Sequence, residues 1–353
     1  MDTLTHALSG ALLARATAPV RPGPGELTSG ARMTIGFVAA AFPDSDFVLR
    51  LFDTLTYVSL HRGVTHSIVL LPGWALLLAW LLSFLWRQRY SWRAIYGTAA
   101  LGIAIHIAGD VITSYGTMVL APFSSQAFAV PYTFIIDPYF TAIIAIGLVA
   151  GRFRPGNRYS AVAALVILGC YVGFQGVLHS HAIKIGEAYK ENKRLINAQV
   201  HAFPQPLSPF NWKIIVSHKG EYEVALVNLR RTRNYPPPES GSGILGMWER
   251  IDAGYQSPSA AAWVRYKQFG ENASRAVLAR EAWEQEIFTR FRGFAKFPVL
   301  DQIEFAGNVV CVSFFDLRFT VPSLPPSLVF GLCRDSPVGP WRFRHDPGLF
   351  GRD

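Results

Sequence analysis

Residues 68–86 contain no charged side chain, and this run constrains the fold of the chain more than any other feature. A helix of about 20 apolar residues crosses the roughly 30 Å hydrocarbon core of a bilayer. Half of all residues are hydrophobic and only 16% are charged, which is too apolar for a disordered chain or an ordinary soluble enzyme. The sequence therefore predicts a membrane protein with a soluble part attached.

Five further apolar segments predict a helical membrane bundle. Segments 94–112, 138–150 and 159–178 complete a set of four strong spans, and two short segments, 4–17 and 31–42, precede them. Short spans have to tilt, thin the bilayer or pack inside the bundle. Arginines cluster in the loops after the first and third strong spans, and the positive-inside rule places such loops in the cytoplasm. This topology puts the N-terminus, read as lacking a cleaved signal peptide, and the C-terminal half outside the membrane, in the periplasm.

Beyond residue 178 the composition changes to that of a small α+β domain. Residues 181–200 predict a helix that leaves the membrane, and prolines from Pro204 onward then interrupt the chain. Antiparallel strands are expected at 212–216, 222–229, 309–319 and 327–332, a loop at 236–243 and a helix at 274–291. The predicted parts are a membrane domain at 1–178, a connecting helix with a Pro-rich linker at 179–205, and an extramembrane α+β domain at 206–353.

Ionisable residues interrupt the apolar helices at one end of the predicted bundle. Such a group inside a bilayer costs roughly 3 kcal/mol or more unless it is partnered, so it marks a functional site by default. His106 and Asp110 are four residues apart on segment 94–112, so their side chains project from one helical face. Other histidines and acids lie at the outer ends of the neighbouring helices. They are His6, Asp44, Asp46, His61 and His66.

Imidazole and carboxylate groups together are ligands for zinc, manganese or non-haem iron, and the absence of nearby cysteine disfavours a structural zinc knot. The candidates outnumber the four ligands of one zinc, so either two ions bind or some of the residues support the ligands and one acts as a general base. The predicted metal ligands are His6, Asp44, His61, His66, His106 and Asp110. The predicted catalytic residues are Asp46, Asp110 and Arg62, with Arg62 as a clamp for an anionic substrate group.

Each of these features also has an ordinary structural explanation. A lone histidine on an apolar helix is usually a satisfied core residue, and the Pro-Asp-Ser-Asp46 segment resembles a helix stop followed by an N-cap. The shared position of several motifs favours a site. For His179 and His181 an interfacial role is favoured, and for Asp137 a helix start. Cys311 and Cys333 could form a disulfide if the C-terminal part is external, but the pairing cannot be read from the sequence.

Four motifs in order carry a family resemblance. They are Met1-Asp-Thr-Leu-Thr-His6, Phe42-Pro-Asp-Ser-Asp46, His61-Arg-Gly-Val-Thr-His66-Ser and His106-Ile-Ala-Gly-Asp110 with Thr113-Ser-Tyr-Gly116. The set resembles the YdjM/YbcI-type family of bacterial membrane-bound, predicted metal-dependent hydrolases. The resemblance implies an inner-membrane location and a hydrolase of undefined substrate. A more distant similarity is to zinc-dependent phospholipase C, without a counterpart of its N-terminal tryptophan ligand.

These observations favour a membrane-bound metal-dependent hydrolase whose site opens at the outer membrane face and acts on a lipid-like ester or phosphoester. Its cofactor would be a divalent metal, with zinc favoured, as one or two ions. The alternative is a non-catalytic membrane anchor or a metal-binding or transport protein, although the nearly apolar inner halves of the spans disfavour transport. The net charge of +9 is not gathered into a polybasic block, so no nucleic acid partner is expected.

Overall fold

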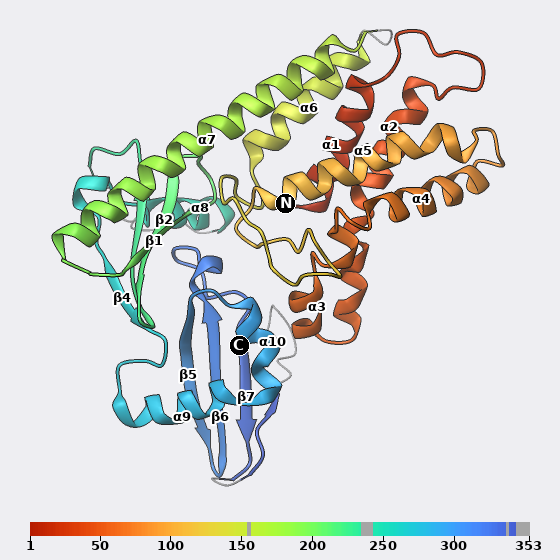
Figure 1. The fold of residues 1–353 in the computed structure, drawn as a ribbon. Helices are drawn as coiled ribbons and strands as arrows, with labels where there is room; N and C mark the ends of the chain where they lie inside the picture. The colour runs from red at the N-terminus through yellow and green to blue at the C-terminus, as the bar shows by residue number, and fades with distance from the viewer. Residues whose placement is uncertain (154–156, 234–242, 337–338, 344–353) are drawn as a thin grey trace. The chain divides into compact units, whose positions relative to one another are not determined.

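A computed structural model describes residues 1–153, 157–233, 243–336 and 339–343 of the chain (Figure 1). The chain divides into two compact units, Met1–Phe52 with Leu60–Val177, and Asp53–Ser59 with Leu178–Asp353. The first unit is helical, and the second contains two antiparallel four-stranded sheets with helices. The predicted combination of a helical membrane part and a small α+β part is therefore confirmed.

Helices form at every segment predicted to be apolar in the first unit. The helices are α1 (Thr3–Ala16), α2 (Ser29–Ala41), α4 (Leu71–Leu85), α5 (Trp92–Val111), α6 (Pro138–Arg152) and α7 (Tyr159–Asn192), the last of which continues into the second unit. Among the helices of the described residues, only α5 and α7 are individually long and apolar enough to cross a membrane. The short helix α3 (Thr54–Leu60) and the 3-10 turn η2 (Val64–His66) would form one further span with α4 only across an 82° bend.

The start of α4 differs from the predicted span at 68–86 because the chain turns before the helix begins. The hydroxyl of Ser67 donates to the carbonyl of Ala121 and accepts from the backbone N–H of Val69 at 3.1 Å. This turn delays the helix to Leu71, and it leaves His66 on η2 instead of on a membrane helix. Hydropathy alone does not register such a turn, because the residues that make it are mostly apolar.

Glycines allow α1, α2 and α5 to pack with their backbones nearly in contact. A Cβ atom built on Gly36 would lie 2.4 Å from the carbonyl oxygen of Gly10, and one on Gly102 would lie 2.9 Å from that of Gly36. Where α1 meets α5, a Cβ on Gly109 would lie 3.1 Å from the ring of His6. At Gly36 and Gly102 no larger residue fits without moving a backbone, whereas at Gly109 the ring of His6 would have to shift. The three helices that carry or precede most of the polar motifs are therefore fixed against one another.

The second unit is built from two sheets. The first contains β1 (Gln199–Pro204), β2 (Asn211–His218), β3 (Glu221–Asn228) and β4 (Val264–Lys267), in that order. The second contains β5 (Pro298–Ala306), β6 (Val309–Asp316), β7 (Phe330–Arg334) and β8 (Arg342–Phe343), also in order. The helices α8 (Gly243–Ala253), α9 (Ala273–Glu284) and α10 (Thr289–Phe294) connect or cover the strands.

Several predicted boundaries in this unit were wrong. The helix predicted at 181–200 ends at Asn192, because Arg194 and Asn197 adopt left-handed backbone angles, and residues 199–204 of the predicted linker form the edge strand β1 instead. Pro204 is tolerated there because it ends an edge strand. The helix predicted at 274–291 is interrupted at Gln285, whose backbone is extended in ψ. The loop predicted at 236–243 lies, except for its last residue, outside the described residues.

Two cores hold the first sheet in place. One face packs against α7 through residues such as Ala182, Trp212 and Ile214, and the other faces the second sheet through Phe203 and Phe297.

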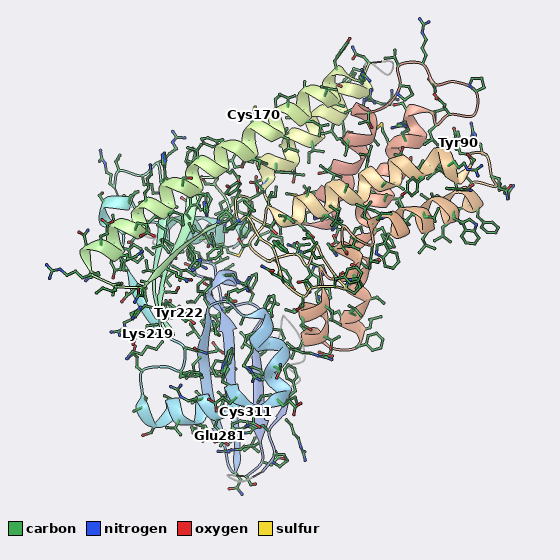
Figure 2. The ribbon with its side chains drawn as sticks, viewed as in Figure 1. Tyr90, Cys170, Lys219, Tyr222, Glu281 and Cys311 are labelled. Carbon is green, nitrogen blue, oxygen red and sulfur yellow. A yellow bond between two sulfur atoms is a disulfide. The ribbon has the colours of Figure 1, made fainter. Side chains whose placement is uncertain are left out.

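Two further groups tie the unit together. Cys311 and Cys333 form a disulfide between the neighbouring strands β6 and β7 (Cys311 is labelled in Figure 2). The fully buried ammonium group of Lys213, on β2, donates to Leu317 O at 2.7 Å and to both oxygens of Thr320; burial lowers its pKa to about 7.

The close packing of glycines where α1 and α2 cross predicts that a Gly→Ala substitution affects the stability of the protein differently at two positions of α2. Gly36→Ala should destabilise the protein by about 1–3 kcal/mol, because the added methyl meets the backbone of Gly10. Gly30→Ala should be neutral or stabilise by up to about 1 kcal/mol, since nothing lies within 4 Å of its Cβ. Thermal unfolding of both variants in detergent measures the difference, and equal effects at the two positions would contradict the close crossing.

Candidate metal centre

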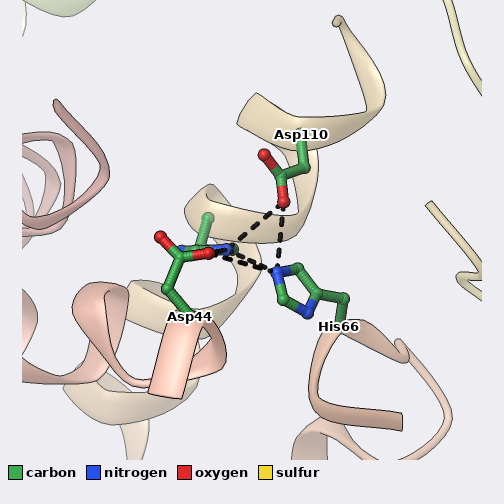
Figure 3. A group of neighbouring side chains, drawn as sticks. Asp44, His66 and Asp110 are labelled. Carbon is green, nitrogen blue, oxygen red and sulfur yellow. Dashed lines mark hydrogen bonds and ion pairs between the residues drawn. The ribbon is translucent and has the colours of Figure 1, made fainter. Parts of the chain in front are cut away.

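Four side chains from three segments converge at one point of the first unit. Asp44 comes from the 3-10 helix η1 (Pro43–Leu51), which follows α2, and His66 comes from η2. His106 and Asp110 lie one turn apart on α5. One ligand atom from each residue lies within 4.8 Å of all the others, and Figure 3 shows the labelled groups pointing toward one another.

The separations between these atoms fit a metal ion. The Nε2 atoms of His66 and His106 are 2.9 Å apart, and Oδ2 of Asp110 is 3.2 Å from the first and 3.4 Å from the second. Oδ1 of Asp44 is 3.6 Å from each Nε2. Ligands about 2 Å from a tetrahedral zinc lie about 3.3 Å from one another, so these five separations are close to the spacing that one such ion requires.

The hydrogen bonds behind each histidine turn an unprotonated nitrogen toward this point. Nδ1 of His106 donates to the carbonyl of Ala40 at 2.6 Å, so in the neutral ring Nε2 carries a lone pair. Nδ1 of His66 lies 2.9 Å from the hydroxyl of Thr65, whose own proton goes to Asp46 at 3.1 Å. Nδ1 of His66 is therefore the donor, and its Nε2 is likewise bare. Two facing lone pairs repel each other, and a cation bound by both nitrogens would remove that repulsion.

Asp110 supplies the strongest sign that a positive ion belongs here. The residue is fully buried, and its Oδ2 has no hydrogen-bond partner among the described residues. Its Oδ1, in contrast, is crowded by donors: Nη2 of Arg62 at 2.9 Å, Nε2 of His6 at 3.0 Å and the α-amino group of Met1 at 2.5 Å. An unpaired carboxylate oxygen in a buried site is costly, and here it faces the bare imidazole nitrogens.

Arg62 is committed to this carboxylate and its helix. Its guanidinium is buried, donates to Thr113 at 2.7 Å in addition to Asp110, and lies over the ring of Tyr115. The residue adopts a left-handed backbone with φ of 63°, which orients its N–H toward Oδ2 of Asp46 at 3.2 Å. Arg62 was predicted to clamp an anionic substrate group, and the structure places its charge on Asp110.

Asp46 and His61 form a pair beside the cluster. Oδ1 of Asp46 lies 2.8 Å from Nδ1 of His61, and Oδ2 accepts from Thr65. The ring of His61 is 5.5 Å from that of His66 and 5.5 Å from that of Tyr115. The side chain of His61 is 12% exposed, whereas that of His66 is fully buried.

Of the six predicted ligands, the structure brings four together and sets two aside. His6 stacks on His106 at 3.7 Å and contacts the other oxygen of Asp110, and His61 contacts Asp46. Asp137 caps α6, as expected, and its Oδ2 accepts from Tyr171 and Gln175.

Several supporting groups were missed by the sequence analysis. The carbonyl of Ala40 orients His106, the hydroxyl of Thr3 donates to Asp44 at 2.6 Å, and the hydroxyl of Thr113 accepts from Arg62. A backbone carbonyl leaves no trace in the sequence. Thr113 lies in the fourth motif, which was a signal that could have found it.

Comparison with known proteins covers the part of the chain that carries this cluster. The family model described as YdjM inner membrane protein matches residues 1–182. A curated relative is the Bacillus subtilis (strain 168) protein named Uncharacterized protein YfhP, 29% identical over 177 residues, which are 49% of this chain and 53% of the relative. The chain thus aligns with about half the length of the curated relative it matches. No solved structure matches it significantly.

Loss of one converging ligand should strongly weaken metal binding. His66→Ala or Asp110→Asn is expected to lower the affinity for Zn²⁺ at least about a hundredfold, because each removes one of only four ligand atoms. His181→Ala, an exposed histidine outside the cluster, is the matched control and should bind as the wild type does. Isothermal titration with Zn²⁺ and elemental analysis of the purified protein measure the effect. Equal stoichiometry in all variants would contradict the assignment.

The hydroxyl of Thr65, which contacts His66, should affect the affinity for Zn²⁺ but not the number of ions bound. Thr65→Val removes the group that links Nδ1 of His66 to Asp46, and we expect Zn²⁺ affinity to fall about 10–100-fold while the stoichiometry is kept. Thr34→Val on α2 removes an exposed hydroxyl that donates to the carbonyl of Gly30, and should leave the affinity unchanged. Unaltered affinity in Thr65→Val would show that the hydroxyl does not orient the ring.

Proposed function

This chain belongs to the YdjM inner membrane protein family, and from that premise we propose that it is a membrane-bound metal-dependent hydrolase. The observation that carries the proposal is the convergence of bare imidazole nitrogens on the unpaired oxygen of Asp110 in a buried cluster. Imidazole and carboxylate ligands at this spacing suit zinc, which we take as the favoured ion. A buried cluster of this kind would be a costly feature in a mere anchor.

The four converging residues would hold the ion, and the groups around them would tune it. A divalent cation bound there would supply a Lewis acid for an ester or phosphoester oxygen and a water of lowered pKa. Arg62 and His6 keep Oδ1 of Asp110 engaged, so that Oδ2 is the oxygen left for the ion. Arg62 therefore acts as a positioning residue in this proposal.

The pair of His61 and Asp46 is the proposed proton carrier. Asp46 accepts from Nδ1 of His61, which fixes the ring and leaves its Nε2 as the basic nitrogen. His61 is also the more exposed of the two histidines in its motif, so a proton taken from the reacting water has a path to solvent. Asp46, predicted as catalytic, would act through His61 in this scheme.

An apolar surface beside the cluster supports a lipid-like substrate. The segment η1 turns Asp44 toward His66, while Phe47 is 60% and Leu51 79% exposed on the same short segment. An amphiphile could therefore place its apolar part against η1 and its ester or phosphoester group near the cluster. The class of substrate we propose is a membrane lipid or another amphiphilic ester or phosphoester.

We further propose a multi-pass topology in the bacterial inner membrane, with the cluster and the second unit at the periplasmic side. The arginine-rich loops support the orientation through the positive-inside rule. The disulfide between Cys311 and Cys333 supports it independently, because such bonds persist in the periplasm and are rare in the cytosol.

A metal-dependent hydrolysis assay tests the function. Protein loaded with Zn²⁺ should release fatty acid or phosphorylated headgroup from mixed phospholipid micelles, and excess EDTA should stop the release. His61→Gln should keep its Zn²⁺ and lose at least about a hundredfold in rate, as expected for a lost general base. His181→Gln serves as the matched control. Stoichiometric Zn²⁺ without hydrolysis of any ester or phosphoester lipid would instead favour the non-catalytic metal-binding alternative.

A further inference from the structure

A second candidate site lies wholly within the second unit and shares no residue with the His/Asp cluster. A pocket of about 410 Å³ opens between the end of the first sheet and the start of β5. Figure 2 labels two of its residues, Lys219 and Tyr222, which lie on the turn and the strand of the β2–β3 hairpin. Its volume is in the range of pockets that bind small molecules.

The pocket has an aromatic floor and a rim set by a tight turn. Phe297, immediately before β5, packs against the ring of His201 at 4.9 Å and that of Tyr222 at 5.8 Å. Lys219 and Gly220 adopt left-handed backbone angles, φ 48° and 79°, which close the hairpin and set Lys219 at the rim. The floor belongs to the core between the two sheets, so it is held by packing.

The electrostatics of the pocket favour an anion. Among the described residues that line it are two lysines, Lys219 and Lys296, and two histidines, and none is acidic. Neither lysine forms an ion pair in the described part of the chain, because the acids nearby are engaged elsewhere: Glu221 pairs with Arg265, and Asp316 pairs with Arg318. Two unpaired cations beside a recess attract negative charge.

Hydrogen-bond donors accompany this charge. The hydroxyl of Tyr222 and the ring nitrogens of His201 make no hydrogen bond within the described residues, although both side chains line the pocket. Burial raises the pKa of Tyr222 to about 12 and lowers the pKa of His201. At neutral pH Tyr222 is therefore a hydroxyl donor, and His201 is a neutral ring with one N–H to offer.

We propose that this pocket binds a small organic phosphate, with the phosphate between Lys219 and Lys296 and the organic part against Phe297 and Tyr222. Phosphate matches the site because it combines negative charge with several acceptor oxygens, as the two ammonium groups and the neutral donors require. The aromatic floor favours an organic phosphate over inorganic phosphate. The inference stands apart from the proposed hydrolase function, since it uses none of the residues of the His/Asp cluster.

Titration of the full-length protein in detergent tests the proposal. Excess EDTA keeps divalent cations from the His/Asp cluster, and the probes are phenyl phosphate, glycerol 3-phosphate and inorganic phosphate, with benzyl alcohol as the neutral control. We expect saturable binding of at least one organic phosphate, tighter than that of inorganic phosphate, and none of benzyl alcohol. Preference for glycerol 3-phosphate would identify a lipid-headgroup type of ligand, and preference for phenyl phosphate an aromatic one; both support the site.

Charge-matched variants distinguish binding in the pocket from general electrostatic attraction to the protein surface. The double variant Lys219→Asn with Lys296→Gln should bind at least about tenfold more weakly, because both exposed lysines supply the anion contact. Asparagine is chosen at 219 because it tolerates the left-handed backbone. The control, Lys184→Gln with Lys193→Gln, removes the same charge outside the pocket and should stay within twofold. Equal losses in both double variants, or no saturable binding up to about 10 mM, would overturn the proposal.

Discussion

The buried carboxylate of Asp110 is the charge around which the first unit is arranged. A charged group at the end of an apolar helix is tolerated only when partners compensate it. Three donors from other segments meet one of its oxygens, and the other oxygen remains unbonded beside two imidazoles. This asymmetry divides the surrounding residues into those that neutralise Asp110 and those that, with it, could hold an ion.

That arrangement depends in turn on how closely the helices approach. Gly36 lies against Gly10 on one side and Gly102 on the other, so α1, α2 and α5 meet at backbone distance. Such packing is common where helices associate without the hydrophobic effect to draw them together. It also places the carbonyl of Ala40 within reach of His106, which fixes the nitrogen that the ring presents.

The sequence predicted the class of fold and the residue types of the His/Asp cluster better than it predicted the geometry of that cluster. Charge-free runs of sufficient length indicate membrane helices, and the four-residue spacing of His106 and Asp110 places both side chains on one helical face. What could not be read is the division between ligands and their supports. His6 and His61 are the same residue type as His66. Only the tertiary structure shows that His6 contacts Oδ1 of Asp110 and that His61 contacts Asp46, outside the group of four converging ligand atoms. The early end of α7 at Asn192 was missed because left-handed residues such as Arg194 have no strong signal unless they are glycine.

The ammonium group of Lys213 has a consequence for the second unit. It reaches from β2, in one sheet, to backbone oxygens that follow β6, in the other. Sliding or separating the two sheets would take the buried ammonium group away from these oxygens, which is costly for a buried charge. The interface between the two sheets therefore resists sliding. The pocket formed along this interface keeps its shape before any ligand binds, which limits the conformational entropy lost on binding.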